Sequence, residues 1–190
     1  LVPLQPRFIL DVATGTGDFA LTALSLNPEK ITGIDISDGM LAEGRKKIIR
    51  KNKHDKIVML NGDSENLPFE DHTFDAATVG FGVRNFENLE RGLAEILRVL
   101  RPGGMLVVLE FSKPRKFPFK QLYNFYFKSV LPRVGKAVSK DSAAYSYLPA
   151  SVDAFPDGDD FTAILIKTGF KNTTCKTLTL GISSIYTAVK

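Results

Sequence analysis

The fold of this chain is decided by the stretch Phe8-Ile9-Leu10-Asp11-Val12-Ala13-Thr14-Gly15-Thr16-Gly17-Asp18. Its apolar first half is typical of a buried strand, and its two glycines form a turn that opens a helix. A strand, a glycine turn and a helix in this order predict the first unit of a parallel α/β sheet. Because glycine lets a ligand approach the backbone closely, the turn predicts a binding site for a nucleoside-bearing cofactor.

The carboxylates on either side of the glycines indicate which cofactor binds. Asp11 and Asp18 would repel a pyrophosphate, although 15–20 also fits the G-x-G-x-x-A pattern of dinucleotide sites. S-adenosylmethionine (SAM) has a cationic amine, a cationic sulfonium and no phosphate. We therefore expect SAM, with its amine near Asp11 and Asp18 and its carboxylate at the N-terminus of the following helix. An NAD-dependent oxidoreductase is the alternative.

Outward from this stretch, strand and helix patterns alternate along all 190 residues. The expected strands are 8–13, 31–36, 57–61, 74–79, 105–111, 171–180 and 182–189. The expected helices are 18–26, 38–51, 89–100, 119–131 and 159–167. Such alternation predicts a mostly parallel, Rossmann-like sheet with helices on both faces, and we expect a single domain over 1–190.

Composition narrows the class of protein. The chain is 44% apolar and 24% charged, as in ordinary globular domains. Its single cysteine, Cys175, cannot form an internal disulfide, and no cysteine or histidine cluster has the spacing of a metal site, so we expect a cytoplasmic protein without a metal. The net charge of +4 would permit RNA binding. However, Val79-Gly80-Phe81-Gly82 stands where amino-methylating enzymes carry Asn/Asp-Pro-Pro-aromatic, so we expect no nucleic acid.

The ends of the later strands complete the expected cofactor site, because ligands of open α/β sheets bind beyond the carboxyl ends of the strands. Asp35 lies at the distance typical of a ribose-binding acid, whereas we expect Asp38 to cap the next helix. Asp63 and Ser64 follow the third strand and are suited to the adenine. The candidate cofactor-binding residues are Asp11, Thr14, Gly15, Thr16, Gly17, Asp18, Asp35, Ile36, Asp63, Ser64 and Gly80.

The fourth expected strand ends in Gly80-Phe81-Gly82-Val83-Arg84-Asn85. This loop falls where the transferred methyl group of SAM should face its acceptor. Arg84 and Asn85 are therefore candidates for contact with the acceptor.

Together these motifs resemble the class I SAM-dependent methyltransferases, and more closely the ubiquinone/menaquinone biosynthesis C-methyltransferase family. The specific matches are 81–85, Leu109-Glu110-Phe111-Ser112-Lys113-Pro114 and Tyr145-Ser146-Tyr147-Leu148-Pro149, and the resemblance covers essentially the whole chain. It implies a sheet of seven strands with an antiparallel last strand. It also implies cofactor contacts at Thr16, Asp35, Asp63, Ser64 and Gly80, and a further N-terminal helical segment.

The family methylates a ring carbon of a polyprenylated quinol, which is demethylmenaquinol, a methoxy-benzoquinol, or both. We expect demethylmenaquinol, as in menaquinone biosynthesis, with the ubiquinone pathway or a non-catalytic SAM-binding module as alternatives. Arg84 would supply the counter-charge for a phenolate. The base is left open among Glu110, Asp141, Tyr145 and water held by Arg84. The candidate catalytic residues are thus Arg84, Asn85, Glu110, Asp141 and Tyr145.

Residues 113–140 predict a contact surface. This segment has eight lysines and arginines and no acidic residue, with aromatic residues interleaved. Phe119, Leu122 and Tyr123 fall at helical spacing with residues 126, 127 and 130, and we expect them to form one stripe. The structural alternative is a helix packed on the sheet with a solvated basic face. The functional one is an entrance for a polyprenyl tail, with the basic face on anionic lipid headgroups at the membrane surface. The sequence does not decide between a monomer and a homodimer.

Overall fold

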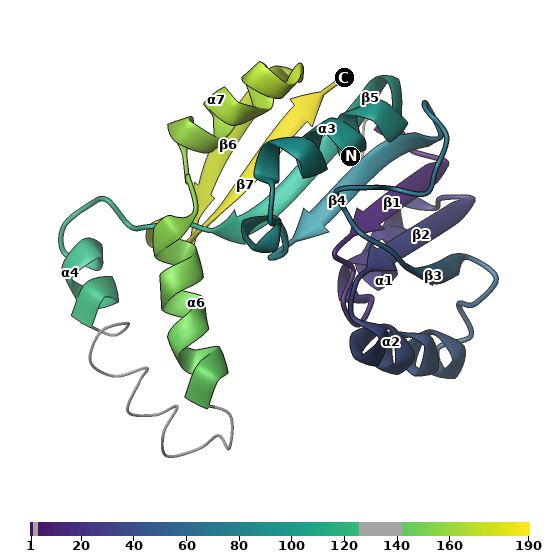
Figure 1. Ribbon diagram of the computed structural model, residues 1–190, viewed down its shortest axis with the longest axis horizontal. Coiled ribbons are helices and arrows are strands. Elements are labelled where there is room, and N and C mark those ends of the chain that lie inside the picture. Colours follow the sequence, from purple (N-terminus) through teal and green to yellow (C-terminus); the bar gives the residue numbers. More distant parts are fainter. Residues whose placement is uncertain (2–3, 126–141) are drawn as a thin grey trace.

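The computed structural model describes residues 1, 4–125 and 142–190. Seven strands form one sheet in the order β3-β2-β1-β4-β5-β7-β6 (Figure 1). The strands are β1 Phe8–Val12, β2 Lys30–Asp35, β3 Ile57–Asn61, β4 Phe74–Gly80, β5 Leu100–Phe111, β6 Lys171–Leu178 and β7 Ser183–Val189. The strands β1 to β5 pair in parallel, and β7 lies antiparallel between β5 and β6. The expected mostly parallel sheet with an antiparallel last strand is confirmed.

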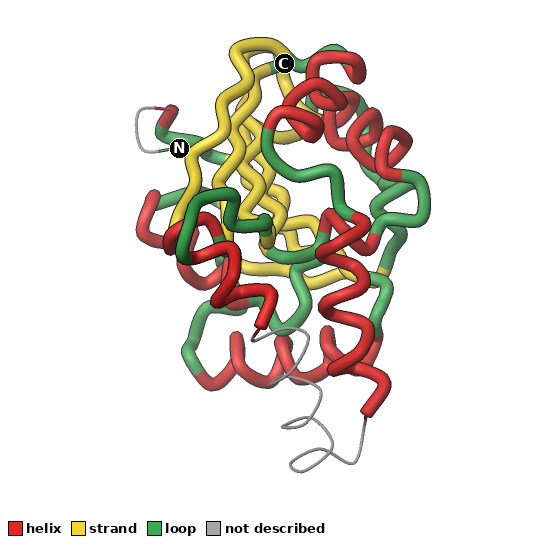
Figure 2. Tube along the Cα trace, turned by 90° about the vertical axis from the view of Figure 1, so that its left-hand side faces the viewer, coloured by secondary structure: helices red, strands yellow, loops and turns green. Residues whose placement is uncertain are grey.

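Helices cover both faces of the sheet (Figure 2). The helices are α1 Asp18–Ala23, α2 Asp38–Arg50, α3 Leu89–Val99, α4 Phe119–Phe125, α6 Ser142–Ala154 and α7 Asp159–Thr168. Short 3₁₀ turns are η2 Leu24–Leu26, η3 Val83–Asn85 and η5 Thr179–Gly181. Figure 1 shows α4 and α6 projecting from the sheet beyond the end of β5.

Alternation along the strands creates two apolar cores, because successive side chains of a strand point to opposite faces. On β1, Ile9 packs with Ala20 and Leu41 of the helices α1 and α2. Its neighbour Leu10 joins the larger core, which includes Ile96 of α3 and Tyr186 of β7. Both Ile9 and Leu10 are fully buried, so the strand that leads into the glycine turn is fixed from both sides.

The structure departs from the expected elements at α6 and at the start of β5. Helix α6 is missing from the sequence prediction, because its interior Pro149 reads as a helix breaker. Strand β5 begins at Leu100 rather than at 105, because Leu100 pairs with Phe74 across an irregularity in the register. The second half of the helix expected over 119–131 lies outside the described residues.

Candidate functional site

A cleft of about 660 Å³ lies at the carboxyl ends of β1, β2, β3 and β4. This is the place where the strand order reverses, since the chain winds from β1 outward to β3 and then returns to β4 on the other side of β1. Residues from four strand ends line it: Asp11, Ala13, Thr14, Gly15, Thr16, Asp18, Phe19, Ile34, Asp35, Ile36, Met40, Gly62, Asp63, Ser64, Glu65, Gly80, Phe81, Gly82, Asn85, Phe86 and Glu87. Every candidate cofactor-binding residue except Gly17 belongs to this lining.

The charge of the cleft is negative although the chain is basic. Asp11, Asp18, Asp35, Asp63, Glu65 and Glu87 line it, and the described lining holds no lysine or arginine. Six carboxylates favour a cationic ligand and disfavour a pyrophosphate. The cleft therefore fits SAM and not a dinucleotide.

The glycine turn is held by a buried carboxylate. Asp11 is fully buried and accepts hydrogen bonds from the hydroxyl groups of Thr14 and Thr78, both at 2.6 Å. Burial raises the pKa of Asp11 to about 6, against the hydrogen bonds that lower it. Asp11 thus joins the ends of β1 and β4 beneath the cleft, and its two oxygens already have protein partners.

Acidification is expected to favour the folded state through Asp11. Because its pKa is about 6 in the folded chain and 3.8 as an ordinary value, its contribution to stability is full below 3.8 and is lost as pH rises through 6. This difference in the pKa of Asp11 corresponds to about 3 kcal/mol in the free energy of unfolding. In urea unfolding from pH 4 to pH 7, the free energy of unfolding of the wild type should rise relative to that of Asp11→Asn as pH falls. If the two free energies changed with pH in parallel, the raised pKa of Asp11 would be wrong.

Asp18 is paired with a lysine that the sequence pattern did not indicate. The Lys47 ammonium group lies 2.8 Å from the Thr16 hydroxyl and 2.8 and 2.9 Å from the two oxygens of Asp18. This hydrogen bond, with one from Thr16, lowers the pKa of Asp18. Lys47 comes from α2, one turn before its end, and ties that helix to the start of α1. The charge of Asp18 is therefore compensated within the protein.

Asp35 closes the cleft at the end of β2. Its two oxygens accept hydrogen bonds from the backbone N–H groups of Gly15, at 2.8 Å, and Ser37, at 2.9 Å. The helix cap differs from the expectation, because the side chain of Ser37 caps α2 and Asp38 is the first helical residue. A backbone φ of 55° at Gly15 explains the glycine there, since other residues rarely adopt this conformation.

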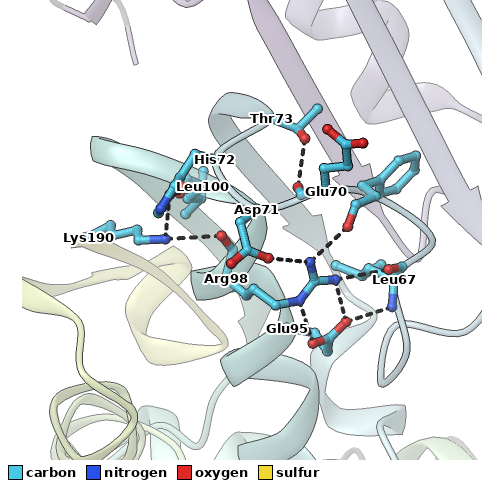
Figure 3. Close-up of polar contacts among 10 residues, drawn as sticks. Leu67, Glu70, Asp71, His72, Thr73, Glu95, Arg98, Leu100 and Lys190 are labelled. Atoms are coloured by element: carbon cyan, nitrogen blue, oxygen red, sulfur yellow. Dashed lines mark hydrogen bonds and ion pairs between the residues drawn. The ribbon is translucent and has the colours of Figure 1, made fainter.

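The β3–β4 connection forms another wall of the cleft, and side chains of α3 hold it in place. Arg98 donates hydrogen bonds to the carbonyl groups of Leu67 and Phe69 and to the carboxylates of Asp71 and Glu95 (Figure 3). Glu95 also accepts from the backbone N–H of Leu67. These contacts fix the second half of the β3–β4 connection, so that its first half can present the lining residues 62–65 at the cleft.

Apolar side chains complete the cleft. Ile36 is 75% exposed and Met40 is 46% exposed, and both face the cleft at the start of α2. Phe19 lies against Gly80, where a side chain on the glycine would collide with its ring. An apolar wall beside the carboxylates of Asp35 and Asp63 suits a flat nucleobase attached to a ribose.

Arg84 and Glu110 form a buried ion pair beside the cleft rather than in it. Their closest atoms are 2.7 Å apart, with side-chain exposures of 10% and 0%. Burial raises the pKa of Glu110, while Arg84 and the N–H of Phe111 lower it. The Arg84 guanidinium also lies 5.3 Å from the centre of the Phe111 ring. Neither side chain belongs to the described lining, so their arrangement suits holding the loop more than touching a ligand.

Asn85 is the candidate catalytic residue that the structure places on the cleft wall. The Tyr147 hydroxyl of α6 donates a hydrogen bond to its side-chain oxygen at 2.9 Å. Asp141 and the side chain of Tyr145 lie outside the described part of the chain. Sequence reasoning therefore missed Lys47, Met40 and Tyr147, although Tyr147 stands in a motif that carries the family resemblance.

Comparisons with known proteins agree with this geometry. The ubiE/COQ5 methyltransferase family matches residues 2–190. A demethylmenaquinone methyltransferase of Bacteroides fragilis is 48% identical over an alignment of 191 positions, which covers 100% of this chain and 78% of that protein. A ubiquinone/menaquinone biosynthesis C-methyltransferase UbiE of Geotalea daltonii is 49% identical and covers 96% of this chain and 78% of that protein.

Solved structures show the same fold. A methyltransferase-like protein of Bacillus halodurans has a TM-score of 0.67 at 21% identity and covers 96% of this chain and 92% of that chain. Phosphoethanolamine N-methyltransferase 2 of Haemonchus contortus, solved with SAM, has a TM-score of 0.71 at 15% identity, over 97% of this chain and 48% of that chain. From the acidic cleft, the sheet order and the match over 2–190, we conclude that the chain belongs to the ubiE/COQ5 methyltransferase family and is a SAM-dependent methyltransferase.

Proposed function

We propose that this enzyme transfers the methyl group of SAM to a ring carbon of a polyprenylated quinol, with demethylmenaquinol as the acceptor. The names of the relatives support this choice, because demethylmenaquinone methyltransferases match the whole chain at 42–48% identity. A methoxy-benzoquinol is the second candidate, since relatives named for both pathways are 45–49% identical. The observation that carries methyl transfer from SAM is the acidic cleft at the strand ends of a chain in this family.

The lining residues suggest how the cofactor is held. Asp35 retains free lone pairs for ribose hydroxyls, and the wall of Ile36 and Met40 suits the adenine, with Asp63 and Ser64 at its polar edge. The methionine end belongs near Thr16 and the N-terminus of α1. SAM supplies a methyl group on a positive sulfur, which would keep the electron pair of the broken bond while the acceptor carbon gains the methyl and releases a proton to water.

The chain then has to orient the acceptor and stabilise its oxygen. A quinol carbon is a weak nucleophile, and it becomes stronger when the neighbouring hydroxyl is held as an oxyanion. The side-chain N–H groups of Asn85, on the loop after β4, are donors on the cleft wall that suit that oxygen. Arg84 and Glu110 fix the loop that carries Asn85, since Glu110 binds both the side chain and the backbone N–H of Arg84.

The proposal is tested by methyl transfer from labelled SAM to chemically reduced demethylmenaquinol, using the complete gene product. A reduced demethylated methoxy-benzoquinol and RNA serve as parallel acceptors. Label in demethylmenaquinol is the expected result, and label mainly in the benzoquinol would assign the other pathway. Tight SAM binding without label in any acceptor would overturn the proposal in favour of a non-catalytic binding module.

We further propose that the enzyme works at the membrane surface, where such an acceptor resides. In the described part of the chain no helix is long and apolar enough to cross a bilayer. Apolar side chains of the 113–125 region are instead exposed, with Phe117 at 80%, Leu122 at 60% and Phe125 at 63%. Tyr123 is buried whereas Leu122 is exposed. The aromatic and apolar side chains expected to form one stripe on this helix therefore lie partly toward the core and partly toward solvent. Residues 126, 127 and 130 lie outside the described part.

Vesicle sedimentation tests this surface. Binding should be stronger to vesicles with anionic lipid than to neutral vesicles and should weaken with salt, because each lysine or arginine near the surface contributes about 1 kcal/mol. Replacing Phe117 and Phe125 with serine should weaken binding to the anionic and to the neutral vesicles. Binding that responds to neither lipid charge nor salt would contradict the proposal.

Lys47→Met is expected to raise the dissociation constant (Kd) for SAM about fivefold. The substitution removes the ammonium group that fixes Thr16 and Asp18 at the glycine turn, so the lining around the methionine end of SAM is held less firmly, and the effect is moderate because Asp18 is 73% exposed. Isothermal titration calorimetry measures the change. Lys46→Met is the control, because this neighbouring lysine pairs with Glu43 at the surface. Equal Kd values for the two variants would show that the Lys47 contact does not support the cofactor.

A further inference from the structure

One face of α6 holds two adjacent residues of η3. Tyr147 and Ser151 are four residues apart, so they lie on the same side of the helix. The Tyr147 hydroxyl donates to the side-chain oxygen of Asn85 at 2.9 Å, and the Arg84 Nε donates to the Ser151 hydroxyl at 3.3 Å. Two neighbouring residues of the methyl-transfer loop are therefore held by the same helix.

The Tyr147 contact determines which groups of Asn85 remain available. Because the phenol proton is donated to its oxygen, both N–H groups of Asn85 are left as donors at the cleft. The Ser151 hydroxyl donates in turn to the carbonyl of Leu148 at 3.0 Å, so its lone pairs face Arg84. The two hydrogen bonds between α6 and the loop therefore run in opposite directions: Tyr147 donates to Asn85, and Ser151 accepts from Arg84.

The anchoring of α6 on the core does not rest on the Tyr147 contact. Helix α6 is anchored in the core by Val152, which is 1% exposed, and by Phe155, which follows its last residue and is 4% exposed. Tyr147 is 55% exposed and lies about one helical turn further from the core. Its hydroxyl therefore contributes little to burial, and its described polar contact is directed at a residue of the cleft wall.

We propose that Tyr147 and Ser151 are positioning residues, which act through Asn85 and Arg84 to aim the N–H groups of Asn85 at the oxygen of the acceptor. This inference rests on the proposed function, in which a quinol oxygen must be stabilised beside the reacting carbon. It deepens that proposal by giving α6 a part in transfer, although the helix contributes no residue to the described cleft lining.

A double-mutant cycle tests the inference. Tyr147→Phe should lower kcat five- to tenfold, the range expected for one hydrogen bond, with the KM for SAM and the melting temperature unchanged. In the background of Asn85→Ala the same substitution should lower kcat no further, because Tyr147 acts through Asn85. Thr174→Val is the control, since it removes a hydroxyl contact of similar length on β6, remote from the cleft.

Ser151 provides the second arm. Ser151→Ala should lower kcat to a smaller extent, and Ser151→Thr, which keeps the hydroxyl group, should restore it. An undiminished kcat in Tyr147→Phe, or an equal further loss in the Asn85→Ala background, would overturn the inference.

A readout independent of turnover separates this inference from the proposed function. The side-chain amide signals of Asn85 in ¹⁵N NMR spectra should shift and exchange faster with solvent in Tyr147→Phe, but not in Thr174→Val. If the wild type methylates no quinol while these signals respond, the proposed acceptor is wrong and the contact stands. Unchanged signals would overturn the positioning role whatever the acceptor.

Discussion

Asp35→Ala is expected to raise the Kd for SAM about 100-fold. The carboxylate has lone pairs for two ribose hydroxyls, and hydrogen bonds to a charged group contribute about 1.5 to 3 kcal/mol each. The substitution also removes the acceptor of the Gly15 and Ser37 N–H groups, so the glycine turn loses one of its supports. Isothermal titration calorimetry measures the loss.

A matched control lies three residues away. Asp38 has the same charge and binds the Asn61 side chain at 3.0 Å, but it does not line the cleft. Asp38→Ala should change the Kd less than threefold, because only the general field of the cleft is altered. Equal losses in the two variants would show that charge alone, and not the position of Asp35, determines the affinity.

Arg84→Met is expected to destabilise the protein by about 3 kcal/mol and to reduce kcat at least tenfold. It leaves the carboxylate of Glu110, which is fully buried, without its charged partner. The loss should be larger at pH 8 than at pH 5, because Arg84 lowers the pKa of Glu110 in the wild type, and without Arg84 the buried acid costs more free energy to ionise as pH rises. Urea unfolding at both pH values measures the stability.

A compensated variant separates stability from activity. Arg84→Met combined with Glu110→Leu removes both charges and should recover most of the lost stability, as apolar replacements of buried ion pairs often do. Its kcat should stay low, since the loop that carries Asn85 still lacks the contacts from Glu110 and Ser151. A double variant with full activity would show that the pair serves stability alone.

The cofactor half of the site could be predicted from the sequence because it depends on local order. Parallel strands bring their carboxyl ends to one edge of the sheet, so Asp35, Asp63 and Gly80 had to meet there once the alternation of strands and helices was recognised. The glycine turn marked the first of these ends. The carboxylates of Asp11 and Asp18 beside the glycines then indicated SAM, although the distances within the site were not known.

The other half depends on contacts between distant segments. Lys47 is 29 residues from Asp18, and Glu110 is 26 from Arg84. The spacing of residues along the sequence does not show that Glu110, a charged residue on β5, is buried against Arg84 from the loop after β4. Helix α6 was missed because Pro149 lies in its interior, and with it the contact of Tyr147 was missed as well.

The insertion of β7 between β5 and β6 has a consequence for synthesis on the ribosome. Strand β5 is complete at Phe111, yet its second neighbour forms only when 183–189 have emerged. Until then β5 is an open sheet edge, and the core lacks Tyr186, whose ring lies 4.8 Å from that of Phe161. From the completion of β5 until 183–189 emerge, the nascent chain therefore carries the whole acidic cleft on a sheet with one open edge, a state that is prone to aggregation.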